Sequence, residues 1–82
     1  MRAENWTQEE VELDGWAIRL RSYQINDRFL TEVEAESSGI IIARGIASSR
    51  EESRREALET ASRRLRRTKL LDLTLGYLTV GG

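Results

Sequence analysis

Apolar and polar residues alternate along the first half of the chain, which is the pattern of strands with one buried face. Asp14-Gly15 separates two such stretches, and Asp-Gly favours a two-residue hairpin turn in which both residues adopt positive φ. The next turn candidates are Asn26-Asp27 and Ser37-Ser38-Gly39. The pattern therefore predicts antiparallel strands near residues 8–13, 16–25, 28–36 and 40–47.

These turns set one register for the whole sheet. The first turn places Leu13 opposite Trp16, and the second places Leu20 opposite Val33, so the larger apolar side chains share an inner face. On the outer face the same register predicts the opposite-charge pairs Glu10–Arg19, Arg19–Glu34, Arg21–Glu32 and Glu32–Arg44. Agreement between turns and pairs supports the predicted sheet.

A helix is predicted near residues 49–67. Ser49 is a good N-cap, and Glu52 three residues later completes a capping box. An apolar stripe at helical spacing is formed by Ala57, Leu58, Ala61 and Leu65. The last predicted strand carries mostly small inner residues, which allow a helix to approach the sheet closely.

The expected fold is α+β, with an antiparallel β-meander of three to four strands packed against one helix. The chain is expected to be a single domain, 1–82, with a final strand or packed tail near 70–80, where leucines alternate with Asp72 and Thr74. The predicted core consists of Trp16, Ile18, Leu20, Phe29, Val33, Ile41, Ala57, Leu58, Ala61 and Leu65.

Composition narrows the possible chemistry. The 82 residues include no Cys and no His, which excludes disulfides and the zinc sites built from these residues. The commonest general base and the strongest nucleophile are therefore missing as well. We expect no enzyme, no catalytic residue, no metal and no cofactor. No apolar leader and no apolar run of about 20 residues is present, so a cytoplasmic location without membrane insertion is expected.

Charge is unevenly distributed. Residues 1–49 carry 5 Arg and 9 acids, a net of −4, whereas residues 50–69 carry 8 basic residues and 4 acids, a net of +4. Acids in the early turns of the predicted helix and basic residues at its end match the helix macrodipole. The basic helix has two interpretations. Either its charges are solvated or attract the acidic sheet, or they bind an anion.

Residues 29–65 resemble the C-terminal half of a double-stranded RNA-binding domain. In that family a strand ending in G-x-G-x-S leads into a helix that begins K-K-x-A-K, and Gly45, Ala47 and Ser49 occupy the strand-end places here. The resemblance implies a β-β-β-α fold and a phosphate-binding role for Arg50 and Arg54. The chain departs from the family at Glu51, where the family has lysine. It also has no counterpart of the family's first helix and long first loop.

Two functions follow as expectations. The first is a small non-enzymatic module of unknown pathway that binds another protein or associates with itself, for example as a homodimer. Its candidate interface consists of Tyr23, Leu30, Ile40, Ile42, Ile46, Leu71, Leu73 and Leu75. The alternative is a nucleic-acid-binding protein, whose candidate contacts are Arg50, Arg54, Arg63, Arg64, Arg66 and Arg67. A carrier role, raised by the terminal Gly81-Gly82, is a minor third interpretation because the helix comes too late in the chain.

Overall fold

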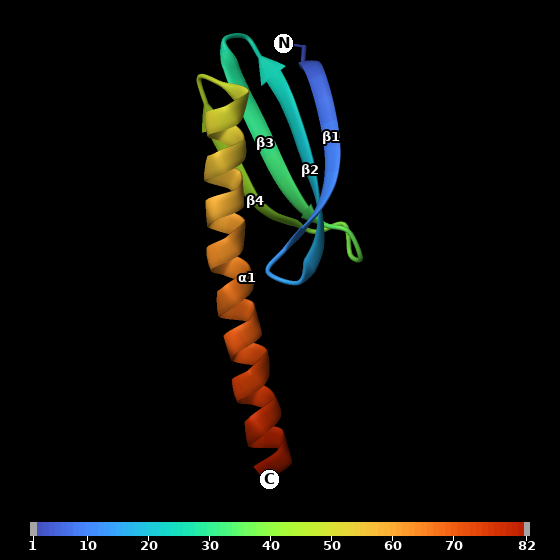
Figure 1. The fold of residues 1–82 in the computed structure, drawn as a ribbon, viewed down its shortest axis with the longest axis vertical. Coiled ribbons are helices and arrows are strands. Elements are labelled where there is room, and N and C mark those ends of the chain that lie inside the picture. The colour runs from blue at the N-terminus through green and yellow to red at the C-terminus, as the bar shows by residue number, and fades with distance from the viewer. Residues whose placement is uncertain (1, 82) are drawn as a thin grey trace.

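Four strands followed by one helix make up the computed structural model (Figure 1). It describes the backbone of residues 2–81 and the side chains of residues 2–68. The elements are β1 (Glu4–Leu13), β2 (Trp16–Ile25), β3 (Arg28–Ala35), β4 (Ile41–Ala47) and α1 (Arg50–Gly81). The strands form one antiparallel sheet in the order β1-β2-β3-β4, so β1 and β4 are its edges. The helix lies on one face, which we call the inner face. The predicted α+β meander is confirmed.

The hairpin turns set the predicted register. Asp14 and Gly15 both have positive φ, 51° and 83°, and Leu13 pairs with Trp16. Asn26 has a φ of 55° at the second turn, after which β3 pairs with β2 as expected. The first strand is longer than predicted, because β1 begins at Glu4 rather than near residue 8.

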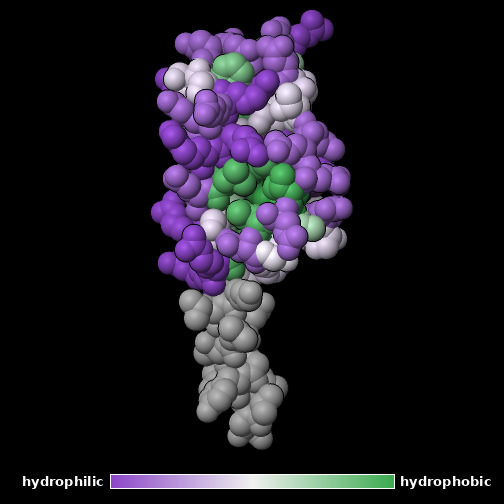
Figure 2. Space-filling model, viewed as in Figure 1, coloured by the Kyte–Doolittle hydropathy of each residue, from purple (hydrophilic) through white to green (hydrophobic). Residues whose placement is uncertain are grey.

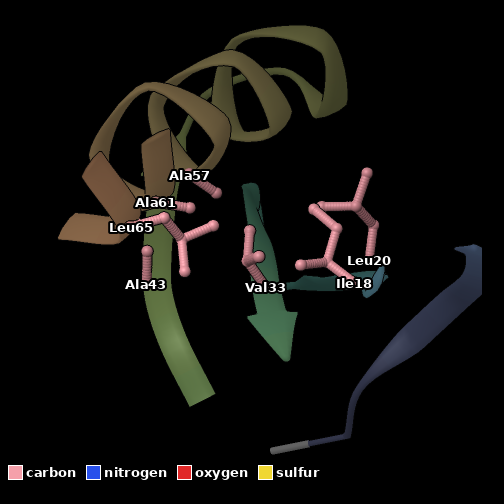
Figure 3. Close-up of a cluster of buried hydrophobic side chains, with 7 residues drawn as sticks. All are labelled: Ile18, Leu20, Val33, Ala43, Ala57, Ala61 and Leu65. Atoms are coloured by element: carbon pink, nitrogen blue, oxygen red, sulfur yellow. The ribbon is translucent and has the colours of Figure 1, made fainter. Parts of the chain in front are cut away.

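The core lies between the inner face and the first turns of α1 (Figure 3). Its buried residues are Ile18, Leu20, Val33, Ala43, Ala57, Ala61 and Leu65. Trp16 and Leu58, both predicted for the core, are half-buried and pack against this cluster. Phe29 is also half-buried, and the guanidinium of Arg50 lies 5.4 Å from its ring centroid.

The prediction for the start of β4 is wrong. Ile41 was expected inside and Ile42 outside, but Ile41 is 40% exposed and Ile42 packs against the core. The cause is a register shift between Val33 and Glu34, which leaves Glu34 opposite Ile41. A β-bulge inserts one extra residue and interrupts the alternation, so Ile41, which precedes the bulge, points to the other face while Ala43 and the residues after it keep their predicted side.

Small residues bring α1 close to the sheet, as predicted. A Cβ built on Gly45 would lie 2.2 Å from the Ser53 carbonyl oxygen and 2.7 Å from the Ala57 nitrogen. Only glycine therefore allows the helix backbone to rest on β4 at this point. Ala57 and Ala61 continue the close packing along the helix and are fully buried.

A buried chain of hydroxyl groups links the layers. Ser53 Oγ donates to the Arg50 carbonyl oxygen at 2.9 Å and lies 2.8 Å from Thr31 Oγ1, which lies 2.8 Å from Ser22 Oγ. Because Ser53 uses its one hydroxyl proton in the bond to Arg50, it accepts from Thr31. Thr31 in turn accepts from Ser22. Each buried hydroxyl thus has a partner, as low-dielectric surroundings require.

The helix begins as predicted but ends later. The Glu52 backbone N–H donates to Ser49 Oγ at 3.2 Å, so Ser49 is the N-cap. The predicted final strand near 70–80 is wrong because α1 continues to Gly81 and runs past the strands in Figure 1. Extending an existing helix avoids the cost of nucleation, and leucine favours helices. Leu71, Leu75 and Leu78 also fit helical spacing.

Candidate interaction surface

Ion pairs cover the middle of the sheet's outer face. The pairs and their N–O distances are Arg19–Glu10, 3.4 Å; Arg19–Glu34, 3.7 Å; Arg21–Glu34, 3.1 Å; and Arg44–Glu32, 3.0 Å. The register predicted for these charged residues is confirmed, although Arg21 reaches diagonally to Glu34 rather than across to Glu32. These charges are compensated within the sheet, so this part of the face carries little unbalanced charge.

An apolar row crosses the same face at the end nearer the β2–β3 turn. Tyr23 on β2 pairs with Leu30 on β3, and Leu30 pairs with Ile46 on β4. Trp6 on β1 stacks on Tyr23, with ring centroids 4.4 Å apart and planes inclined by 26°. We call Trp6, Tyr23, Leu30 and Ile46 the outer apolar row. Its two ends are open to solvent, because Trp6 is 58% exposed and Ile46 is 56% exposed.

A bulge in β1 accompanies the placement of Trp6 in this row. Asn5 has a φ of 54°, and the β1–β2 register shifts between Glu4 and Thr7. Asn5 Nδ2 donates to Gln24 Oε1 at 2.7 Å, which ties the bulge to β2. The candidate interface derived from the sequence lacks Trp6, because the first predicted strand begins after it. The available signal was an apolar aromatic residue just upstream of an alternating stretch.

Tyr23 has an altered acidity in the row. Burial raises the pKa of its phenol above the ordinary value, the nearby Glu32 carboxylate raises it further, and Arg44 lowers it in part. The phenol is therefore protonated throughout the neutral range and is available as a hydrogen-bond donor at the edge of an apolar contact.

The other predicted interface residues do not join the row. Ile40 is 64% exposed but precedes β4, at the other end of that strand from Ile46. Ile42 faces the core because of the β4 bulge. The side chains of Leu71, Leu73 and Leu75 lie outside the described residues. The row thus contains three of the predicted residues and adds Trp6.

Part of the inner face is also apolar and open. The helix packs mainly on β4 and β3 and touches β2 less. Figure 2 shows apolar surface beside α1 on the face it partly covers. Four half-buried apolar residues of β1, β2 and α1 pack against the core from this face: Val11, Leu13, Trp16 and Leu58. We call these four residues the inner strip.

Arginines on α1 clamp the helix to β1. Arg50 Nη2 donates to the Asn5 carbonyl oxygen, and Arg54 binds Glu9 through two nitrogens at 2.9 and 3.3 Å. Further toward the C-terminus of α1, Ser62 Oγ donates to Asp14 Oδ2 at 2.7 Å. Arg66 Nη2 donates to Ser62 Oγ at 2.8 Å, and Arg66 Nε lies 3.9 Å from the same Asp14 oxygen. The acidic sheet and basic helix therefore attract each other, which was one of the two interpretations of the charge asymmetry.

Of the remaining predicted arginines, Arg64 lies on the β4 side of α1, and Arg63 and Arg67 line a hollow together with it. Arg64 Nη1 donates to the Ile42 carbonyl oxygen at 2.6 Å, and Arg63 Nη2 approaches Thr60 Oγ1 at 3.5 Å. An open hollow of about 260 Å³ is lined by Thr60, Arg63, Arg64 and Arg67. Arg50, Arg54 and Arg66 therefore contact β1 or the turn that follows it, whereas Arg64 contacts β4.

A carboxylate cluster and a membrane-spanning helix are two further kinds of site to consider in the described part of the chain. Within residues 2–68, whose side chains are described, no three carboxylates come together as a metal site would require. In the part of the chain that the structure describes, no helix has both the length and the apolar character needed to cross a membrane. The chain matches no protein-family model, and no curated protein or solved structure is significantly similar to it.

Proposed function

We propose that the chain is a small non-enzymatic protein-interaction module that associates with itself through the outer apolar row. The observation that carries the proposal is the row itself. It spans all four strands on the face opposite α1, and both of its ends are more than half exposed.

The row has the composition of an interface centre. Trp and Tyr are enriched among residues that dominate binding energies, because they bury much area with few rotatable bonds. Tyr23 keeps its proton, so its hydroxyl is able to bond to a partner while the ring is buried. The ion pairs beside the row provide a polar rim that limits how a partner is oriented.

Light scattering tests the proposal. The molar mass of the full chain should exceed that of a monomer at high concentration and change little between low and high salt, because apolar association is weakly screened. Trp6→Ser together with Ile46→Ser should give a monomer. The matched control is Ile40→Ser with Ile41→Ser, which removes two exposed isoleucines outside the row.

A version ending at Lys69 distinguishes the row from a second interface. If this truncation yields a monomer while the Trp6 and Ile46 variant still associates, the interface is formed by the predicted residues Leu71, Leu73 and Leu75, with the inner strip as the surface that they contact. A monomer at every concentration of the unmodified chain contradicts self-association outright.

Nucleic-acid binding is the alternative function. It is supported by the hollow between Arg63, Arg64 and Arg67, where an anion has several guanidinium donors in reach. The engagement of Arg50 and Arg54 with β1 argues against the contacts implied by the resemblance. Binding to RNA or DNA should weaken steeply with salt. Replacing Arg63 and Arg67 by Glu should abolish it, whereas Arg50→Glu with Arg54→Glu should chiefly loosen the helix from β1.

A further inference from the structure

One edge of the sheet has backbone groups directed away from β3. The Ile42 carbonyl accepts from Arg64 rather than from a strand, so it points away from β3. In an antiparallel strand, alternate residues direct both N–H and C=O to the same side. The N–H and C=O groups of Arg44 and Ile46 therefore also point outward from β4. An edge strand of this kind is a template for an added strand.

The two faces of this edge differ in chemistry. On the inner side, Arg64 of α1 lines the hollow described above together with Arg63 and Arg67. A second hollow, at the edge itself, is lined by Arg64 with Ile41, Ala43 and Arg44. On the outer side, the exposed neighbours are apolar: Ile41 is 40% exposed and Ile46 is 56% exposed. Arg44 lies between them with its charge paired to Glu32.

This division specifies what an added strand would carry. Successive side chains of a strand point to opposite faces. A strand beside β4 would direct every second side chain toward the arginines of α1, where carboxylates are favoured. Its alternate side chains would lie next to Ile41 and Ile46, where apolar residues are favoured.

The chain's own edges do not satisfy this requirement. A second β4 would bring arginine against arginine. The other edge, β1, is acidic, but Glu10 and Glu12 lie on its outer face while Val11 and Leu13 lie on its inner face, and the carboxylate of Glu9 on the helix side already binds Arg54. That arrangement is the reverse of what the β4 edge favours, so the occupant is a different protein.

We propose that the free edge of β4 binds an extended segment of a partner protein in which acidic and apolar residues alternate. The segment pairs with the backbone of Arg44 and Ile46, and its carboxylates bind Arg63, Arg64 and Arg67. This inference rests on the proposed function, since both take the chain to be a protein-binding module. It concerns the sheet edge, whereas self-association concerns the outer apolar row.

The probe is a ten-residue peptide of alternating Glu and Val, blocked at both ends. It is titrated into the full chain, and into the chain carrying Trp6→Ser to weaken self-association, while backbone amide resonances are followed by NMR. The expected result is saturable binding in both, with the largest shifts at Arg44 and Ile46. Methylating alternate backbone nitrogens of the peptide should abolish binding, because it removes the ladder donors.

Charge variants locate the contact. Arg63→Glu with Arg67→Glu should weaken peptide binding by about tenfold or more, since charge-assisted pairs are replaced by repulsion. The matched control is Arg28→Glu with Arg55→Glu, which changes net charge equally at exposed positions that do not line either hollow. It should weaken binding by about twofold or less, as screened long-range charge does.

Four outcomes overturn the inference. Equal weakening of peptide binding by both double variants would show that the peptide is held by non-specific charge attraction. Undiminished binding of the methylated peptide would exclude strand addition, and tighter binding of a single-stranded oligonucleotide than of the peptide would favour the nucleic-acid alternative. Self-association of the unmodified chain without any peptide binding would contradict this inference and leave the proposed function standing.

Discussion

Successive residues of the same strands point to the inner and the outer face of the sheet. The two faces differ in what covers them. The inner face has small residues on β4 and a helix whose backbone nearly touches Gly45. The outer face has no covering element among the described residues and is occupied by ion pairs and the outer apolar row. Close packing against α1 determines which residues fit on the inner face, whereas paired charges make most of the outer face compatible with exposure to solvent.

This difference has a consequence for function. Residues on the inner face are constrained by close packing, so changes there act on folding. Trp6 and Ile46 are exposed and contribute little to the core, so the fold alone does not explain their presence. Changes in the outer apolar row should therefore alter association much more than stability.

The largest effect is expected at Gly45. Gly45→Ala places a methyl group against the Ser53 carbonyl and the Ala57 nitrogen, so α1 has to move away from β4. We expect a loss of about 3 kcal/mol or more in the free energy of unfolding, measured by urea denaturation.

The control for this substitution is Gly15→Ala. Gly15 has nothing within 4 Å of an added Cβ, but its φ is 83°. It should lose only about 1–2 kcal/mol through backbone strain. Equal losses at the two glycines would mean that close helix packing at Gly45 is not the cause.

The next effect concerns the buried hydroxyls. Thr31→Val removes the central link, leaving Ser22 without its acceptor and Ser53 without its donor. Stability should fall by about 1–3 kcal/mol, because a buried polar group loses its partner. Thr7→Val, at an exposed strand position, should change it by less than about 0.5 kcal/mol. A stability unchanged by Thr31→Val would show that the hydroxyl chain is dispensable.

A smaller effect is expected at Trp6. Trp6→Ser removes an exposed ring and its stacking on Tyr23, so stability should fall by only about 1 kcal/mol. Leu20→Ala, on the inner face, should cost about 2–5 kcal/mol in the same assay. The two faces would not differ as described if Trp6→Ser were as destabilising as Leu20→Ala.

The smallest effect is the titration of Tyr23. Its folded pKa lies above the unfolded value of 10.0, so the protonated phenol contributes stability that is fully present below pH 10 and is lost as pH rises through the folded pKa. Ultraviolet titration should show one tyrosine ionising above the ordinary range, and Tyr23→Phe should remove that step. Ionisation of Tyr23 at or below its ordinary pKa would contradict its burial beside Glu32.

Much of the sheet was predictable because local signals agreed. Asp14-Gly15 fixed the first hairpin, and the outer charge pairs supported the same register through β3. The start of β4 was not predictable from alternation, since a bulge moves one residue without changing the composition of the strand. That single residue exchanged the roles of Ile41 and Ile42.

The candidate site was predicted in part. Tyr23, Leu30 and Ile46 followed from their alternation with charged residues, but Trp6 was missed because the first strand was predicted to begin near residue 8, whereas β1 begins at Glu4. The arginines were visible as a basic cluster, yet their division between a clamp on β1 and the β4 side requires the position of the helix over the sheet. Tertiary geometry, not residue type, assigns these roles.

The most direct test follows Trp6 itself. The chain contains two tryptophans, so Trp16→Phe leaves Trp6 as the sole tryptophan, which is excited at wavelengths where tyrosine does not absorb. Its fluorescence is recorded over a dilution series beside light scattering of the same samples. If the outer apolar row is the interface, emission should shift to shorter wavelength as the molar mass rises, with a common midpoint. A rising mass with unchanged emission, or a monomer throughout, would contradict the account.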